Sequence, residues 1–261
     1  MSITAKDVMS LRQATGVGMM DAKKALEAND GNMEAATQWL RVQGLASAAK
    51  RADREAGEGS VAVVRDGHVA AMVELRCETD FAAKSDDFTA LVDEMAARVC
   101  AAGEGAIAEF QDRIETMLTT LKENISVGRV YRVVAGEGEV VDTYNHQNKG
   151  RNVVIVVLKG GDEELAHEVA VHIAFAKPQY LSREDVPAEE VEAERKTIEE
   201  ISLNEGKPAA ALPKIIEGRL NGWFKERVLV EQPFAKDDKQ SVAQFIGDAS
   251  ITAYAQVVIG G

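Results

Sequence analysis

The side chains best suited to catalysis or metal binding do not have the spacing that either would need. They are His68, His146, His167, His172, Cys77 and Cys100. His167 and His172 fall on one predicted helix, but residues five apart do not share a helix face. No HExxH, GxSxG or catalytic-cysteine signature occurs. The sequence therefore predicts no catalytic residue, no metal site and no cofactor, and indicates a protein that acts by binding.

Carboxylate pairs and a glycine-containing turn offer no better site. The carboxylate pairs are Asp86-Asp87, Glu189-Glu190 and Asp237-Asp238. Neighbouring side chains point apart on a helix or strand, so each pair is most simply solvated charge. The run Gly16-Val17-Gly18 follows no strand and is followed by no Lys-Ser/Thr at P-loop spacing, so it is not a phosphate-binding loop.

The stretch that the chain is organised around is residues 77–84, CETDFAAK. Apolar residues alternate before it, as in a half-buried strand, and recur at helical spacing after it. The first set is Val69, Ala71, Val73, Leu75 and Cys77, and the second is Phe88, Leu91, Val92, Met95, Ala96 and Val99. Phe81 thus lies on a strand-to-helix turn, where a projecting ring beside Asp80 would present an apolar wedge to another protein. The alternative is that Phe81 folds back under its own helix while Asp80 caps it.

Composition limits the partners. The chain has 261 residues, a formal net charge of −13, 46% hydrophobic and 28% charged residues. An acidic chain is a poor binder of duplex nucleic acid or of an anionic membrane, and no run approaches the roughly 20 apolar residues that a bilayer requires. The first residues lack the apolar core of a signal peptide, and two isolated cysteines suit a reducing compartment. We therefore expect a cytoplasmic protein with no direct contact to nucleic acid or membrane.

The first 54 residues predict three short helices. Thr4 caps the first, and the second, after residues 16–18, places Met19, Ala22, Ala25 and Leu26 on its inner face. The third is expected to stop at Gly44, because glycine is common at the position just after a helix. Met20 falls on the outer face with Lys23, Lys24 and Glu27. It is either an adaptable binding residue or ordinary scattered surface apolarity.

The middle of the chain predicts a repeated arrangement of strands and helices. Strands are expected at 60–65, 68–76, 127–134, 139–144 and 152–158, the first two joined by a tight hairpin at Asp66-Gly67. The last of these has no alternation, so both its faces should be buried. A helix is expected at 108–123, and another ends at Lys177-Pro178. A strand pair followed by a helix occurs in each half, which indicates an internal duplication.

The last third is charged and helical at first. Residues 182–224 predict two helices with a thin apolar stripe, typical of a protruding hairpin. That stripe is Val186, Val191, Ile198, Ile201 and Leu203. A helix near 241–247 and a closing strand at 251–259 end the chain.

Two long motifs resemble those of one family, bacterial elongation factor Ts. They are residues 11–26, LRQATGVGMMDAKKAL, and residues 74–84, ELRCETDFAAK. Shorter motifs follow in family order at 176–178, 205–208, 217–219 and 232–234, with sequences AKP, EGKP, EGR and QPF. The resemblance spans nearly the whole chain and implies a guanine-nucleotide exchange factor for elongation factor Tu, not an enzyme.

The resemblance also implies an α+β fold with small antiparallel sheets and a division of the chain into segments. Residues 1–54 would form a three-helix N-terminal domain similar in fold to ubiquitin-associated (UBA) domains. Residues 55–135 would form the first α+β half, and 136–181 with 225–261 the second. Residues 182–224 would be an inserted helical hairpin, which mediates homodimerisation in some members. A second copy of this chain, bound weakly through the hairpin, is therefore among the expected partners.

The site residues implied by the resemblance lie in three places. Thr79, Asp80, Phe81 and Ala82 would dislodge Mg²⁺ from the GTPase. Leu11, Arg12, Met19, Met20 and Lys23 would contact its nucleotide domain, and His146 another part of it. Some members continue into a C-terminal helix that contacts the partner, and because this chain stops at Gly260-Gly261 that contact is not carried over.

Two other readings stay open at this level. An adaptor or chaperone-like protein could use the three-helix segment to hold a partner, and would need the exposed methionine but no special turn at Phe81. A small α+β enzyme would need polar residues that converge in a pocket.

Overall fold

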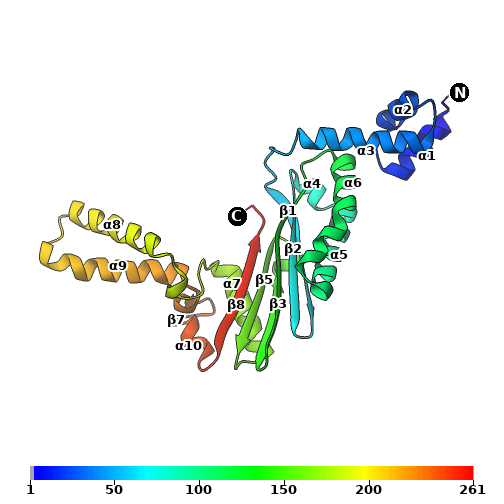
Figure 1. The fold of residues 1–261 in the computed structure, drawn as a ribbon. Coiled ribbons are helices and arrows are strands. Elements are labelled where there is room, and N and C mark those ends of the chain that lie inside the picture. The colour runs from blue at the N-terminus through cyan, green and yellow to red at the C-terminus, as the bar shows by residue number, and fades with distance from the viewer. Residues whose placement is uncertain (1–2, 261) are drawn as a thin grey trace.

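Two small antiparallel sheets form the centre of the molecule, with helical parts on either side (Figure 1). The computed structural model describes residues 3–260 of the chain. The first sheet has the order β1-β2-β3 and the second β4-β5-β8. The strands are β1 (Glu58–Asp66), β2 (Val69–Cys77), β3 (Ser126–Val134), β4 (Glu139–Asn145), β5 (Asn152–Lys159) and β8 (Ser250–Val258). The predicted α+β class with small antiparallel sheets is confirmed.

The same topology occurs twice. In each sheet an antiparallel strand pair leads into a helix, and a third strand then pairs with the second strand of that pair. In the second sheet the third strand is β8, so the segment between α7 (Glu163–Ala176) and β8 is an insertion in the repeated pattern. Strands β3 and β4 follow one another in the chain but pair in different sheets.

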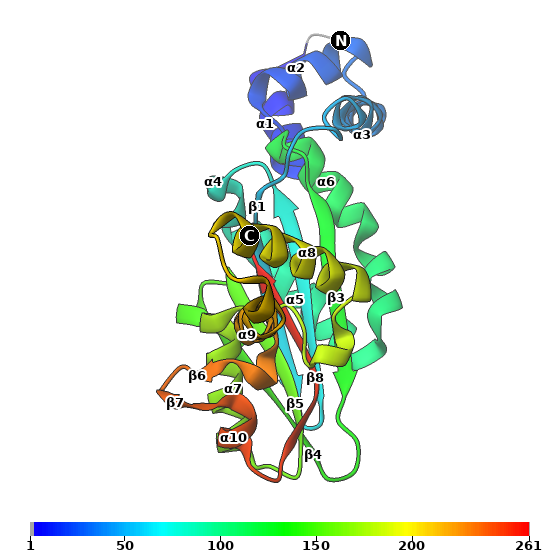
Figure 2. The same cartoon turned by 90° about the vertical axis from the view of Figure 1, so that its left-hand side faces the viewer.

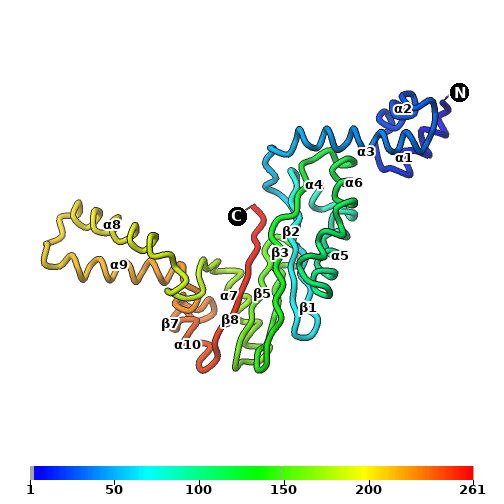
Figure 3. Tube along the Cα trace, viewed as in Figure 1, coloured from blue at the N-terminus to red at the C-terminus, as the bar shows by residue number. Residues whose placement is uncertain are grey.

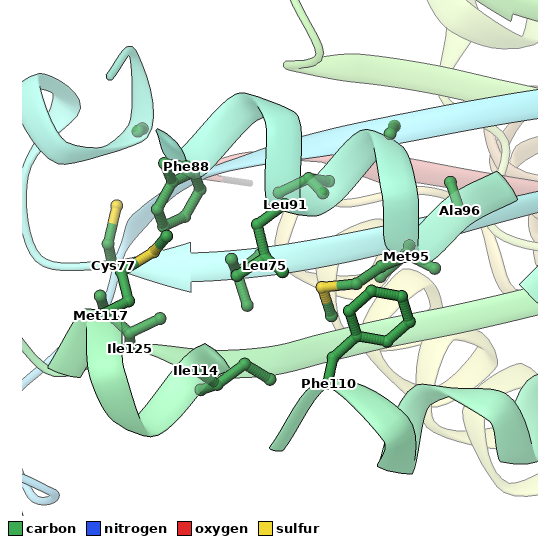
Figure 4. Close-up of a cluster of buried hydrophobic side chains, with 14 of the residues drawn as sticks. Leu75, Cys77, Phe88, Leu91, Met95, Ala96, Phe110, Ile114, Met117 and Ile125 are labelled. Carbon is green, nitrogen blue, oxygen red and sulfur yellow. The ribbon is translucent and has the colours of Figure 1, made fainter. Parts of the chain in front are cut away.

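The sheets stack face to face between two layers of helices. One core joins the outer face of the first sheet to α5 (Asp86–Ala102) and α6 (Gln111–Leu121). Figure 4 shows Leu75 and Cys77 of β2 between Phe88 and Leu91 of α5 and residues of α6. A second core lies between the sheets, and a third joins the outer face of the second sheet to α7.

This stacking corrects one prediction and confirms another. Strand β2 was expected to be half-buried, but Ala70, Met72 and Glu74 on its supposed outer face are also buried. Their face packs against the second sheet, whose presence the alternation along one strand does not reveal. Residues 153–158 of β5 are all buried, as their unbroken apolar run predicts.

Three helices form a separate bundle at the start of the chain: α1 (Ala5–Thr15), α2 (Met19–Ala28) and α3 (Met33–Ala49). Thr4 caps α1 as expected, in a capping box with Asp7. Gly44 does not end α3. A Cβ there would lie 2.4 Å from Thr119 Cγ2, so the glycine allows α3 to pack closely on α6. The expected helix at 108–123 is shorter, because residues 104–110 form a 3₁₀ turn and α6 ends at Leu121.

A helical hairpin extends from the other side of the molecule, away from the three-helix bundle (Figure 3). It consists of α8 (Ala188–Asn204) and α9 (Leu212–Arg227). Val186 and Ile198 of the predicted stripe are buried, but Ile201 and Leu203 are exposed near the end of α8. The inner positions come instead from α9, as Ile216, Leu220 and Phe224. Within residues 3–260 no helix is both long and apolar enough to span a bilayer.

A buried histidine ties the hairpin's base to the second sheet's helix. His172 of α7 lies 3.0 Å from Gln232 Oε1 through Nε2, and its Nδ1 accepts the Ala235 amide proton at 3.2 Å. Gln232 in turn donates to the carbonyl oxygens of Ala176 and Glu226. The short elements that follow are β6 (Pro233–Phe234), β7 (Asp237–Ser241) and α10 (Val242–Ile246). Burial lowers the pKa of His172, against the opposing effect of the Gln232 hydrogen bond.

This geometry predicts a loss of stability below the usual histidine pKa. The unfolded chain takes up a proton at His172 as the pH falls through about 6.5, whereas the folded chain resists it. The free energy of unfolding should therefore be fully retained above that pH. Below it, the loss should approach about 1.4 kcal/mol per pH unit until the folded state is also protonated. Urea unfolding between pH 7.5 and 5 measures this.

The matched variants are His172→Gln and His68→Gln, the second at an exposed position in the β1–β2 turn. His172→Gln should flatten the pH dependence, and His68→Gln should leave the slope as in the parent. Equal slopes for the parent and His172→Gln would contradict the assignment.

Candidate partner-binding surface

The turn after β2 forms a compact corner that holds Phe81 outward. The corner consists of Thr79 and the single-turn helix α4 (Asp80–Ala83). Thr79 caps this helix, because its hydroxyl accepts the Ala82 amide proton at 3.2 Å. Ala82 and Ala83 are buried in the first core, so the opposite side of the turn faces solvent. Phe81 lies on that side with 85% of its surface exposed, which excludes the alternative that it folds under its own helix.

Glu123 fixes the corner from a distant part of the chain. Its Oε2 accepts the amide protons of Glu78 and Thr79, both at 3.1 Å, and its Oε1 accepts the Thr79 hydroxyl proton at 2.6 Å. Glu78 in turn accepts the Asn124 amide proton at 2.7 Å. These bonds clamp the end of β2 to the segment between α6 and β3. The sequence did not reveal this role of Glu123, which is the last residue of the helix expected at 108–123 and lies more than 40 residues from the corner in the chain.

Asp80 gives the exposed ring a charged neighbour. Its Oδ2 accepts a hydrogen bond from Lys84 Nζ at 2.6 Å. This hydrogen bond and the charges of Lys84 and Arg151 lower the pKa of Asp80 below its usual value. The carboxylate is therefore ionised at neutral pH. The corner presents an apolar ring beside a fixed negative charge, with Lys84 on the following turn.

The three-helix bundle carries a second exposed apolar surface. Met20 is 73% exposed and Met19 46% exposed, so Met19 was wrongly assigned to the inner face of α2. Arg12 and Lys23 are exposed as well. Leu11 is fully buried in the bundle core. Its side chain holds the helices together, and a direct contact with a partner would require them to separate.

Polar contacts set the position of this bundle on α6. Arg41 of α3 pairs with Asp112 at 2.7 Å and with Glu115 at 3.2 Å. Lys122 also pairs, at 2.7 Å, with Asp21, the residue that follows Met20. Because Glu123 follows Lys122 directly, the same short segment holds both the bundle and the corner. The bundle with its exposed methionines and the corner with Phe81 thus both contact residues 122–123.

The third predicted residue, His146, lies in the loop between β4 and β5. It is exposed, and its Nδ1 lies 3.0 Å from the Tyr144 hydroxyl. The loop reaches the first sheet, because the Val61 amide donates to the Gly150 carbonyl oxygen at 2.8 Å. Arg151 pairs with Glu58 at 2.6 Å, and Glu58 is opposite Cys77 in the β1–β2 pair. The His146 loop and the corner therefore lie at the same end of the stacked sheets.

The side chains most relevant to catalysis are either buried or paired with structural partners. Burial raises the pKa of Cys77 to about 11, with a further contribution from Glu123, so its thiol stays protonated. His167 is paired with Asp142 at 2.9 Å, and His172 belongs to the network described above. Within residues 3–260, no group of three or more His, Cys, Asp or Glu residues is arranged to hold a metal ion.

Comparisons with known proteins give one consistent family. The model of the family described as "Elongation factor TS" matches residues 78–260. The chain is 45% identical over 275 residues to "Elongation factor Ts" of Clavibacter michiganensis, with 99% of each chain covered. The corresponding protein of Micrococcus luteus is 45% identical over 276 residues, with 98% of each covered. That of Renibacterium salmoninarum is 46% identical over 267 residues, covering 96% of this chain and 95% of the relative.

The clamp at the corner can be tested without a partner. Glu123→Ala removes the acceptors of three hydrogen bonds, so we expect the free energy of unfolding to fall by about 1–3 kcal/mol. The amides of Glu78 and Thr79 should exchange with deuterium markedly faster. Peptide-resolved hydrogen exchange and urea unfolding measure the two effects. Glu137→Ala, at an exposed position in the β3–β4 loop, is the control and should change neither. Unchanged exchange at residues 78 and 79 in Glu123→Ala would show that Glu123 does not hold the corner.

Proposed function

The chain belongs to the elongation factor Ts family, and we infer that it is a guanine-nucleotide exchange factor that binds elongation factor Tu in its GDP-bound form. It promotes release of GDP so that GTP can be loaded during translation elongation. It acts by binding rather than by making or breaking a covalent bond, and its place of action is the cytoplasm. The observation that carries the proposal is Phe81, an 85% exposed ring on a clamped corner within the family's matched segment.

The corner is the element that displaces the nucleotide. We assign Phe81 to an apolar pocket near the nucleotide site of the GTPase, with Thr79, Asp80 and Ala82 setting its approach. Entry of the ring and of the ionised Asp80 disturbs the coordination of Mg²⁺, which is the largest local charge holding the phosphates. Thr79 and Ala82 contribute by fixing the turn, since one caps it and the other anchors it in the core.

The energy for exchange has to come from several contacts. Moving a partner from mostly loaded to mostly empty requires a difference in binding free energy of roughly 5 kcal/mol between its two states. Linkage requires nucleotide to weaken the binding of the factor by the same ratio. Burial of one phenylalanine contributes about 1.5–3 kcal/mol, so Phe81 alone is too little. Loss of the Mg²⁺ charge that holds the phosphates supplies the rest of this difference, whereas docking through the other surfaces adds affinity for both states of the partner.

The docking surfaces are the exposed residues of the bundle and the His146 loop. We assign Arg12, Met19, Met20 and Lys23 to the nucleotide domain of the GTPase and His146 to another of its parts. Leu11 supports the first group from within the bundle core. We do not favour the adaptor alternative, because it would need neither the exposed corner nor the match of the elongation factor Ts family model to that segment.

Phe81→Ala tests the displacement step. The variant should lower the rate of GDP release at saturating factor by about tenfold to a hundredfold, because it removes the buried ring from the displaced state. Its affinity for the GDP-bound GTPase, in which the ring is not yet buried, should fall less than that. Stopped-flow release of fluorescent GDP from elongation factor Tu measures the rate. Val134→Ala, which truncates an exposed apolar residue at the far end of β3, is the control. An unchanged saturating rate in Phe81→Ala would refute the role of the ring.

Met20→Ala tests docking separately. Truncation of an exposed methionine should raise the factor concentration for half-maximal release by about threefold to tenfold, with the saturating rate retained. The same stopped-flow assay, titrated with factor, gives both quantities. A lowered saturating rate with no shift in the half-maximal concentration would place Met20 in displacement rather than docking.

A further inference from the structure

A second aromatic ring, Phe175, is nearly as exposed as Phe81. It is 77% exposed, which makes these two the most exposed of the large apolar side chains in residues 3–260. Exposure of one apolar residue is ordinary on a protein surface. Phe175 differs from such a residue in two ways. Side-chain hydrogen bonds hold the backbone around it, and it lies at the same end of the sheets as the corner.

The helix geometry directs Phe175 away from its own core. The inward side of α7 includes Val169, Ala170 and Ile173, which pack on the second sheet. Phe175 follows Ile173 by two positions, which is about 200° around the helix axis. The neighbouring carbonyl groups are both bonded, since Ala174 accepts from Asn152 Nδ2 at 2.8 Å and Ala176 from Gln232 Nε2 at 3.3 Å. The end of α7 is therefore fixed with the ring in solvent.

A chain of contacts places this ring at the same end of the sheets as the corner. Asn152, bonded to Ala174, follows Arg151, and Arg151 pairs with Glu58 at 2.6 Å. Glu58 is the register partner of Cys77, which leads into the corner. In Figure 2 the strands run roughly from top to bottom, with α4 beside their upper end and α7 lower down on the same side of the view. Phe175, the His146 loop and Phe81 thus belong to one continuous end of the molecule.

Phe81 and Phe175 lie on opposite faces of the two stacked sheets, which pack about 10 Å apart. A single apolar pocket on a partner therefore does not receive both rings. Two exposed lysines lie along this end of the second sheet, on a chain whose net charge is −13: Lys177, two residues after Phe175, and Lys149 in the His146 loop. Arg151 is half-buried and paired with Glu58. In a two-fold symmetric dimer through this patch the same basic groups would face one another, which disfavours a second copy as its occupant.

We propose that Phe175 is a second aromatic anchor for elongation factor Tu, which enters an apolar pocket with an acidic border on a part of the GTPase distinct from the one that receives Phe81. This inference rests on the proposed exchange function. Phe175 contributes to affinity in every nucleotide state, because it lies on the helix layer of the second sheet and not at the corner. The His146 loop lies between the two anchors and is covered when both are engaged.

Phe175→Ala tests this assignment in the full chain. We expect the affinity for nucleotide-free elongation factor Tu, measured by calorimetry, to fall about tenfold to thirtyfold. The rate of GDP release at saturating factor should stay within about twofold of the parent, unlike that of Phe81→Ala. Phe175→Tyr keeps the ring and should bind within about threefold. Phe175→Lys suits an exposed helix position and gives a second loss-of-ring variant should the alanine variant not fold.

Val134→Ala is the matched control, an exposed apolar truncation at the opposite end of the first sheet. It should leave the affinity unchanged. Full affinity in Phe175→Ala or Phe175→Lys, with an active parent, overturns this inference alone. A parent that neither binds elongation factor Tu nor releases GDP overturns the proposed function as well. A parent dimer in sedimentation that Phe175→Ala abolishes, with affinity for the GTPase intact, assigns the ring to self-association and overturns the inference.

Discussion

The structure depends on one constraint, which is that the turn after β2 must pack two small residues into the core while it leaves a large one outside. Ala82 and Ala83 fit against the first sheet and α5 because they are small. Thr79 caps the turn and donates its hydroxyl proton to Glu123, and these two hydrogen bonds fix the backbone where β2 ends. Phe81 is then held in solvent by the same packing that buries its neighbours, so no partner is required to extract it. The exposed ring is pre-organised, which lowers the entropic cost of binding.

The stacking of the two sheets converts this local feature into a surface. Strands β2 and β5 are buried on both faces, and their partners bring the corner, the His146 loop and the end of α7 to one end of the sandwich. The bundle that carries Met20 is positioned by ion pairs on α6 and on the residue before Glu123. A protein with several separated contacts can bind both states of a partner and still distinguish them at one point. That division of roles is what exchange by linkage requires.

The sequence predicted the structure well where residues close together in the chain decide it. The capped first helix, the unbroken apolar run of β5 and the strand-to-helix turn at residues 77–84 all occur as expected. Errors arose where packing partners come from elsewhere. Gly44 lies inside α3 and not at its end, where it leaves room for Thr119 of α6. Ile201 and Leu203 are exposed because α9 supplies the inner residues of the hairpin. The outer face of β2 is buried because a second sheet covers it.

The sequence by itself determined which residues form the corner, that the chain has an α+β fold, and which family it resembles, since motifs and periodicity are properties of short segments. Only the tertiary structure decided that Phe81 is exposed, that Glu123 clamps it and that Leu11 is buried. It also brought Phe175 and Phe81, 94 positions apart in the chain, to the same end of the molecule. Side-chain exposure and contacts between distant segments depend on how sheets and helices stack, and that stacking is a property of the whole fold.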